Sequence, residues 1–176
     1  NASGQIEMCV SVVVPAFNAS ATIERCLVAL LAQQNSPPLE IILVDDGSQD
    51  ATPEIATRFP QVHLIRSSHQ GAAAARNLGA REAHADILLF TDADCEPAPD
   101  WVREMLLPFA DNAVIGAKGV YRSRQRERIA RFVQLEYAEK YARMSGDRTI
   151  DFIDTYSAGY RRAVFLNNGG FDEQFP

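Results

Sequence analysis

Two acidic pairs, Asp45-Asp46 and Asp92-Ala93-Asp94, are spaced for chemistry, and each follows directly on a short apolar segment. Carboxylates that gather in a cleft repel one another, and a divalent cation relieves that repulsion. Mg²⁺ and Mn²⁺ prefer oxygen ligands, and Mg²⁺ typically uses one or two carboxylates together with substrate phosphates. A lone Asp-x-Asp is usually a turn or a helix cap. A pair at the end of a buried strand, with a second acidic pair two strands away, instead predicts a divalent-cation site.

A sheet must position these carboxylates. Apolar, β-branched runs predict strands at Cys9–Val14, Leu39–Val44, Val62–Arg66, Ile87–Thr91 and Ala113–Val120. Helical spacing predicts helices at Thr22–Ala32, Gly71–Ala83, Trp101–Phe109, Gln125–Met144 and Arg161–Leu166. A further short helix is expected to begin at Thr52, with Thr52 as its N-cap and Pro53 in its first turn. Residues 151–160 are expected to be extended. This alternation predicts an α/β fold, a single domain whose mostly parallel sheet carries helices on both faces.

Ligands of such sheets bind beyond the carboxyl ends of the strands. The turn Pro15–Asn18 and the segment Ser67–Gly71 follow strands there, so His69 has some chance of lining the cleft, whereas the other two histidines are expected at structural or surface positions. Small residues from Gly71 onward open a helix whose N-terminus favours anions, and Arg76 lies one turn in. The alternative reading is a helix that packs tightly through its alanines, and the two readings are compatible.

The sequence lacks the motifs that several other kinds of binding or catalytic site require. The first strand is followed by no Gly-x-Gly-x-x-Gly, and the chain holds no phosphate-binding Gly-x4-Gly-Lys loop and no Gly-x-Ser-x-Gly elbow. Residues 45–50 lack the Gly position and closing Glu of a calcium loop. The three cysteines, Cys9, Cys26 and Cys95, match no zinc pattern and suit a reducing cytoplasm as free thiols.

Composition sets the broad class. The 176 residues are 47% hydrophobic and 23% charged with a net charge of −6, which describes one globular domain and argues against nucleic acid as a partner. Residues 121–148 hold eight basic against four acidic side chains. That segment could meet a diphosphate or an anionic membrane surface, although a solvated helix face is the simpler reading. The chain is expected in the cytoplasm, with contact at the inner face of the membrane as a further option.

Four segments together resemble glycosyltransferase family 2, whose domain has the nucleotide-diphosphosugar transferase fold called GT-A, a Rossmann-like arrangement. They are VSVVVPAFNASATIERCLVALLAQ, EIILVDDGSQDAT, HQGAAAARNLGAREAHADILLFTDADCEP and GGFDE, and they occur in the family's order between residues 10 and 173. Residues 1–8 are expected to be a tag or a disordered N-terminus, and the resemblance divides the rest into a donor-binding half (9–120) and the start of an acceptor-side half (121–176).

The resemblance implies roles for individual residues. The turn Pro15-Ala16-Phe17 would lie against the nucleotide base, and Asp46 would hydrogen-bond that base, usually uracil. Arg76 would hold base or phosphate. The Asp92-Ala93-Asp94 motif would bind the ribose and a Mg²⁺ or Mn²⁺ ion, with Asp94 the more direct ligand. The metal would then stabilise the departing nucleoside diphosphate.

The implied activity is transfer of a sugar, with inversion, from a nucleotide-diphosphosugar, usually a UDP-sugar, to an acceptor. In the family a Glu-Asp pair after the GGFDE segment supplies the general base, and this chain contains no such pair. The base is therefore expected beyond Pro176, and this polypeptide is expected to bind donor but to turn over poorly. Tyr156 and Ser157 match the acceptor floor, and either sheet packing or contact with a glycan or polyprenyl phosphate would account for them.

Two alternatives belong to other classes. Sugar nucleotidyltransferases share the fold but usually carry a Gly-rich loop with Arg and Lys after the first strand, which residues 15–20 lack. A non-catalytic module that binds nucleotide-sugars is the other alternative.

Overall fold

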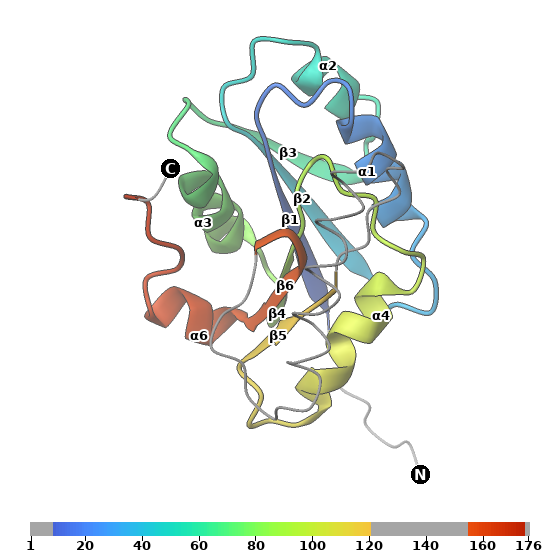
Figure 1. The fold of residues 1–176 in the computed structure, drawn as a ribbon, viewed down its shortest axis with the longest axis vertical. Coiled ribbons are helices and arrows are strands. Elements are labelled where there is room, and N and C mark those ends of the chain that lie inside the picture. The colour runs from blue at the N-terminus through green and yellow to red at the C-terminus, as the bar shows by residue number, and fades with distance from the viewer. Residues whose placement is uncertain (1–8, 121–154, 175–176) are drawn as a thin grey trace, which may run out of the picture.

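The computed structural model describes residues 9–120 and 155–174. Within these ranges one sheet has the strand order β3-β2-β1-β4-β6-β5 (Figure 1). The strands are β1 (Val10–Ala16), β2 (Leu39–Asp45), β3 (Val62–Arg66), β4 (Ile87–Phe90), β5 (Gly116–Lys118) and β6 (Ala158–Arg161). The first four are parallel, whereas β6 is antiparallel to both of its neighbours. The predicted α/β class with a mostly parallel sheet is confirmed.

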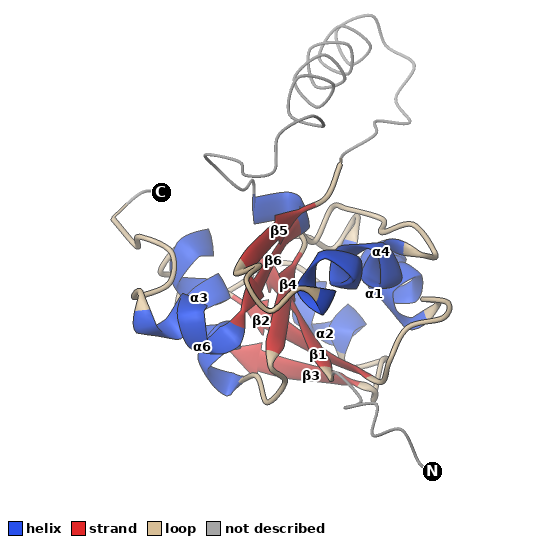
Figure 2. Cartoon of the chain, turned by 90° about the horizontal axis from the view of Figure 1, so that it is seen from below, coloured by secondary structure: helices blue, strands red, loops and turns tan. Residues whose placement is uncertain are grey.

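Helices cover both faces of this sheet. The α-helices are α1 (Ile23–Leu31), α2 (Thr52–Ala56), α3 (Ala72–Glu82), α4 (Trp101–Leu106) and α6 (Arg162–Asn167), and two 3₁₀ segments are η1 (Leu107–Ala110) and η2 (Thr155–Ser157). Figure 2 shows α3 and α6 on one side of the strands and α1, α2 and α4 on the other. Each side has its own apolar cluster, so the sheet separates two core layers.

The central strand β1 explains why its sequence is apolar without alternation. Val12 and Val14 pack into the cluster that contains α1 and α4, while Val13 packs into the cluster that contains α3. All three side chains are fully buried. A parallel strand covered on both faces must be apolar at successive positions, which is the pattern the sequence has.

Strands β1 and β2 extend beyond their predicted ends, so residues that were expected to follow the strands belong to them. β1 continues to Ala16 and β2 to Asp45, paired residue by residue along their whole lengths. Pro15 is tolerated inside β1 because the ladder to β4 ends at Val13, which leaves Pro15 with a partner strand on one side only. The turn that was predicted to begin at Pro15 therefore begins after Ala16.

Local chemistry accounts for the other differences. The helix predicted over Trp101–Phe109 changes to 3₁₀ geometry after Leu106, because Pro108 has no N–H to donate within an α-helix. Thr52 is the first residue of α2 and not its N-cap; its hydroxyl accepts from the Ala19 N–H at 2.7 Å and donates to Asp50. The predicted fifth strand shortens to Gly116–Lys118.

Some predictions lie outside the described residues. They are the helix over Gln125–Met144, the extended chain before residue 155, the basic segment at 121–148 and the character of residues 1–8. Among the helices that are described, none has both the length and the apolarity that crossing a bilayer requires.

Gly79 lets α3 lie directly against the sheet. A Cβ atom at this position would stand 2.4 Å from Val13 Cγ1 and 3.2 Å from Val44 Cγ2. Both valines are fully buried within strands of the sheet, so neither can move aside easily. The close approach matters for function because α3 carries Arg76 toward the carboxyl ends of the strands.

We predict that Gly79→Ala destabilises the protein, although alanine is the better helix former by about 1 kcal/mol. The added methyl group forces α3 away from β1 and β2, and overpacking of this kind costs about 1–3 kcal/mol. Chemical denaturation measures the free energy of unfolding, with Glu82→Ala on the exposed side of α3 as the control. A stabilised Gly79→Ala protein would contradict the close packing.

Candidate functional site

One pocket of about 470 Å³ lies at the carboxyl ends of β1, β2 and β4. All the residues predicted to bind a donor line it, namely Pro15, Ala16, Phe17, Asp46, Arg76, Asp92, Ala93 and Asp94. The other lining residues are Asn18, Ala19, Thr22, His69 and Ala72. His69 therefore lines the cleft, as its position at a strand end indicated, whereas the rest of this second set was not singled out as binding residues from the sequence.

Two aromatic rings form one wall of the pocket. Phe17, just beyond β1, stacks on His69 with a centroid separation of 4.0 Å and an interplanar angle of 20°. Both side chains remain accessible, since Phe17 is 45% exposed and the His69 side chain 58% exposed. A flat, solvent-accessible apolar face of this kind suits a planar heterocycle.

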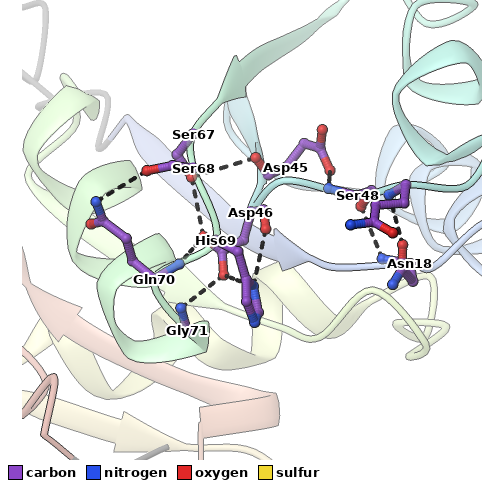
Figure 3. Close-up of polar contacts among 10 residues, drawn as sticks. Asn18, Asp45, Asp46, Ser48, Ser67, Ser68, His69, Gln70 and Gly71 are labelled. Carbon is purple, nitrogen blue, oxygen red and sulfur yellow. Dashed lines mark hydrogen bonds and ion pairs between the residues drawn. The ribbon is translucent and has the colours of Figure 1, made fainter.

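The buried carboxylate of Asp46 fixes the position of this wall (Figure 3). Its Oδ1 accepts from the Gln70 N–H at 2.9 Å and the Ser67 hydroxyl at 3.2 Å. Its Oδ2 accepts from the Gly71 N–H at 2.8 Å and lies 2.9 Å from His69 Nδ1. A carboxylate has about four acceptor positions, so protein donors already occupy those of Asp46.

Gly47 allows the segment that carries His69 to come this close. It has φ +78°, and a Cβ there would lie 2.9 Å from the His69 backbone nitrogen. Glycine is required both for the left-handed conformation and for the space.

The loops after β1 and β2 hold each other in place. The backbone N–H of Asn18 donates to the Ser48 hydroxyl at 2.9 Å, and the Asn18 side chain accepts from the Gln49 N–H at 2.8 Å. Ser20 donates its N–H to Asp50, and hydrogen bonds from Ser20 and Thr52 hold the pKa of the Asp50 carboxyl below its usual value. These reciprocal bonds keep the pocket rim ordered without a ligand.

Asp45 does not contribute to the pocket. It is fully buried, accepts from the Ser48 N–H at 3.1 Å and lies 3.5 Å from the Arg66 guanidinium. The two acidic pairs thus do not gather into one cluster. Within the described part of the chain, no group of three or more His, Cys, Asp or Glu side chains could hold a metal by itself.

Elsewhere in the lining of the pocket, Arg76 and Asp92 form an ion pair. The Arg76 guanidinium, carried by α3, lies 2.5 Å from Asp92 Oδ1, and Arg76 is only 9% exposed. Its Nε is buried and has no hydrogen-bond partner among the described residues. Asp94 is exposed, and its carboxylate meets only a long contact from Cys95 Sγ at 3.7 Å within the same residues. Asp94 is thus the carboxylate left for a ligand.

Two thiols lie beneath this acidic loop. Cys26 Sγ donates to the backbone carbonyl of Asp92 at 3.6 Å. Burial, reinforced by neighbouring negative charge that includes Asp92 and Asp94, raises the pKa of Cys26 to about 12. The same causes raise the pKa of Cys95 to about 11. Both thiols are therefore neutral near pH 7, which is consistent with structural rather than nucleophilic roles.

The two predicted acceptor-side residues do not line the pocket. Ser157 is buried, where its hydroxyl accepts from Trp101 Nε1 at 2.9 Å and contacts Met105. Tyr156 is half-buried beside it.

Sequence reasoning missed Asn77, which ties the GGFDE segment to α3. Its amide donates to the Phe171 carbonyl and to Glu173 Oε1, both at 2.8 Å, and accepts from the Phe171 N–H at 2.8 Å. Gly170 has φ +73°, and a Cβ there would meet Asn77 Oδ1 at 2.3 Å. Two neighbouring residues of α3 thus have different roles. Arg76 faces the pocket, whereas Asn77 contacts the last described segment. The only sequence signal was that Asn77 lies inside a quoted motif.

The sheet order and the pocket at its carboxyl edge define a GT-A fold of the nucleotide-diphosphosugar transferase class. A family model for glycosyl transferase family 2 matches residues 11–168. The chain therefore belongs to glycosyl transferase family 2.

Known proteins resemble it over part of their lengths. Glycosyltransferase AglE from Haloferax volcanii is 39% identical over 99 residues, which is 53% of this chain and 33% of that protein. The putative glycosyltransferase EpsH from Bacillus subtilis is 35% identical over 106 residues, or 58% of this chain and 30% of its own length. The matched part of the chain thus spans about a third of the length of these two relatives.

Solved structures share the fold. The mannosyltransferase PcManGT from Pyrobaculum calidifontis, in complex with GDP-Man and Mn²⁺, superposes with a TM-score of 0.71 at 27% identity, covering 93% of this chain and 47% of that one. The 1-349 fragment of TarS from S. aureus gives a TM-score of 0.68 at 22% identity, covering 95% and 51%.

We predict that Asp46→Asn lowers the free energy of unfolding by about 2 kcal/mol or more, because the new amide group faces donors that the carboxylate had satisfied. The same change weakens UDP binding, since the segment from Ser67 to Gly71 loses its anchor. Denaturation and calorimetry measure the two effects. Asp86→Asn, on an exposed residue before β4, is the matched control and leaves both unchanged. Unaltered stability of Asp46→Asn would refute the anchoring role.

Proposed function

We propose that this domain is the donor-binding part of a glycosyltransferase that uses a nucleotide-diphosphosugar. The observation that carries the proposal is the convergence, in one pocket, of an accessible aromatic stack, a buried arginine and an available carboxylate. A nucleoside diphosphate has groups that match these features: a flat base for the aromatic stack and a charged diphosphate for the arginine and for a cation held by the carboxylate.

The proposed donor lies with its base against Phe17 and its diphosphate toward Arg76 and Asp94. Arg76 has a buried Nε without a partner, so it has a donor left for a phosphate or ribose oxygen after pairing with Asp92. The GDP-Man complex of PcManGT supports a nucleotide-sugar donor, because that protein shares both fold and 27% identity with this chain. Uracil is the proposed base, following the family resemblance, with guanine as the competing choice.

The residues of the pocket could hold a divalent cation only if the donor supplies further ligands. Asp94 offers an exposed carboxylate and Asp92 a half-buried one, whereas no three-ligand cluster exists among the described residues. Mg²⁺ and Mn²⁺ sites of this type complete their coordination with substrate phosphates and water. A bound cation would supply charge neutralisation for the departing diphosphate. Mn²⁺ in the PcManGT complex is in line with that assignment.

The proposed reaction is attack of an acceptor hydroxyl or polyprenyl phosphate oxygen on the anomeric carbon, with inversion, while the bond from that carbon to the diphosphate oxygen breaks and the nucleoside diphosphate leaves. Arg76 would orient the leaving group from the side of α3. We assign the role of general base to none of the described residues, so no residue of this pocket is proposed to take the proton from the acceptor. The domain's own contribution is thus donor binding, orientation and electrostatic stabilisation.

The direct test is calorimetric titration of this chain with UDP and GDP, each with and without Mn²⁺. We expect one of the two to bind, and to bind more tightly with the metal, because the cation screens repulsion between the diphosphate and the acidic loop. ADP serves as a base control and uridine as a control without phosphate. Failure of every nucleoside diphosphate to bind, at concentrations up to the millimolar range, would contradict the proposed function.

Asp94→Ala tests the metal assignment. We expect it to weaken nucleoside diphosphate binding about tenfold in Mn²⁺, the cost of one charge-assisted contact, and to change binding little in EDTA. Asp86→Ala, at the opposite end of β4, is the matched control. Equal losses with and without metal would count against Asp94 as a ligand.

A further inference from the structure

The guanidinium of Arg76 contacts two segments that are far apart in the chain. It pairs with Asp92, in the loop after β4, at 2.5 Å, and its Cζ lies over the ring of Phe171 at 5.9 Å from the ring centroid. A guanidinium within about 6 Å of an aromatic centroid is in the range of a cation–π attraction. This attraction is stronger where water is excluded, and Arg76 is only 9% exposed. Phe171 therefore helps to hold the charge of Arg76 in place.

The contact with Phe171 differs from the ion pair in what it asks of the ligand site. Asp92 lines the pocket, and its bond to Arg76 Nη2 competes with any ligand or cation that needs the same carboxylate. Phe171 does not belong to the lining of the pocket, so a ligand there does not compete for its ring. Arg76 Nε also has no hydrogen-bond partner among the described residues. The aromatic support can thus persist while Arg76 donates to a ligand.

Asn77, the next residue of α3, fixes the backbone of Phe171. Its side chain donates to the Phe171 carbonyl and accepts from the Phe171 N–H, both at 2.8 Å, and it is only 3% exposed. Gly169 and Gly170 precede this contact with φ of +85° and +73°, which glycine adopts readily. Two hydrogen bonds to one residue set its position and its orientation, so Phe171 has a fixed place beside α3.

The ring of Phe171 is held by an aromatic cluster on the same side of the sheet as α3. It packs edge-on or tilted against three rings at centroid separations of 5.1–6.2 Å, namely Phe90 of β4, Tyr160 of β6 and Phe165 of α6. Interplanar angles of 68° to 82° are the arrangement that aromatic pairs prefer. The orientation of the ring under Arg76 is therefore determined by the core and not by a mobile contact.

We infer that Phe171 is a positioning residue of the donor site: held by Asn77 and the aromatic cluster, its ring supports the Arg76 guanidinium and preorganises it for a nucleoside diphosphate. This role rests on the proposed function and deepens it. An arginine side chain loses much rotamer freedom when a ligand fixes it, and a guanidinium that is already held avoids part of that cost. Residues 169–174, which the family resemblance places in the acceptor-side half, thereby contribute to donor binding.

Calorimetry on the whole chain tests this role, with UDP or GDP, whichever the unmodified chain binds more tightly, in Mn²⁺ and in EDTA. Phe171→Leu keeps an apolar side chain but removes the ring, so we expect the affinity to fall about fivefold, the contribution of one cation–π contact. We expect the same factor in EDTA, because Arg76 does not bind a cation. Phe171→Tyr keeps the aromatic face, and we expect its affinity to stay within about twofold of the unmodified chain.

Phe165→Leu is the matched control. Phe165 packs against the same rings, but the Arg76 guanidinium lies over Phe171. We therefore expect Phe165→Leu to lower the thermal midpoint and to leave the affinity unchanged. A loss of affinity as large as that of Phe171→Leu would show that general packing is responsible, and it would overturn the role of Phe171.

Two further measurements isolate the charge. In an Arg76→Gln protein, we expect Phe171→Leu to change the affinity by less than about twofold, because no cation remains over the ring. Phe171→pentafluorophenylalanine keeps the shape of the ring while fluorine withdraws electron density from its face, so we expect a loss similar to that of Phe171→Leu. An unchanged affinity of the fluorinated protein would overturn the role of Phe171, even if Phe171→Leu failed to fold.

The outcomes separate the two levels of the proposal. If the unmodified chain binds a nucleoside diphosphate and its affinity does not respond to changes at Phe171, the role of Phe171 is overturned and the donor site stands. Loss of binding to every nucleoside diphosphate by the unmodified chain would instead contradict the proposed function and the role of Phe171 with it.

Discussion

The buried carboxylate of Asp46 is the contact on which the pocket depends. It stands at the end of β2, beside the end of β1, and it receives hydrogen bonds from the segment between β3 and α3. Three chain segments distant in sequence are thereby fixed to one point. A buried charge is costly unless hydrogen bonds satisfy it. The same bonds that satisfy Asp46 therefore also determine where His69 and the start of α3 lie.

The parallel sheet explains why this point lies at the pocket. β1, β2 and β4 end at the same edge, so the residues after them converge although they are tens of positions apart in the chain. Gly79 brings α3 against the strands and so delivers Arg76 to that edge. Two glycines, Gly47 beside the His69 segment and Gly79 within α3, thus allow the close approaches that position the polar side chains that we assign to donor binding.

Charges within the site are divided between structure and ligand. The carboxylates of Asp45 and Asp46 already interact with donor groups of the protein, and Asp92 is paired with Arg76. Asp94 is the carboxylate that remains exposed. Such a division limits repulsion within the pocket, because among its acidic lining residues only Asp94 is left without a strong protein partner. It also means that the affinity for a diphosphate is set by Arg76 and by whatever cation Asp94 recruits.

Local patterns in the sequence were enough to determine the fold class, most element positions and the set of residues around the pocket. Apolar runs that end in acidic pairs specify buried parallel strands, and parallel strands place their carboxyl ends together. The family motifs added specific roles for Arg76 and for the turn near Phe17, whose positions at the strand ends had already been predicted. Boundaries were less well predicted at Pro15 and Pro108, because the effect of a proline depends on whether its missing N–H had a partner.

What each polar residue bonds to was decided by the tertiary structure alone. Nothing local indicates that Asp46 meets four donors, that Arg76 pairs with Asp92, or that Asn77 holds Phe171. Likewise, the insertion of β6 between β4 and β5 follows from long-range pairing. The physical reason is that sequence periodicity reports which face of an element is buried, whereas hydrogen-bond partners depend on distances between elements that only the packed chain fixes.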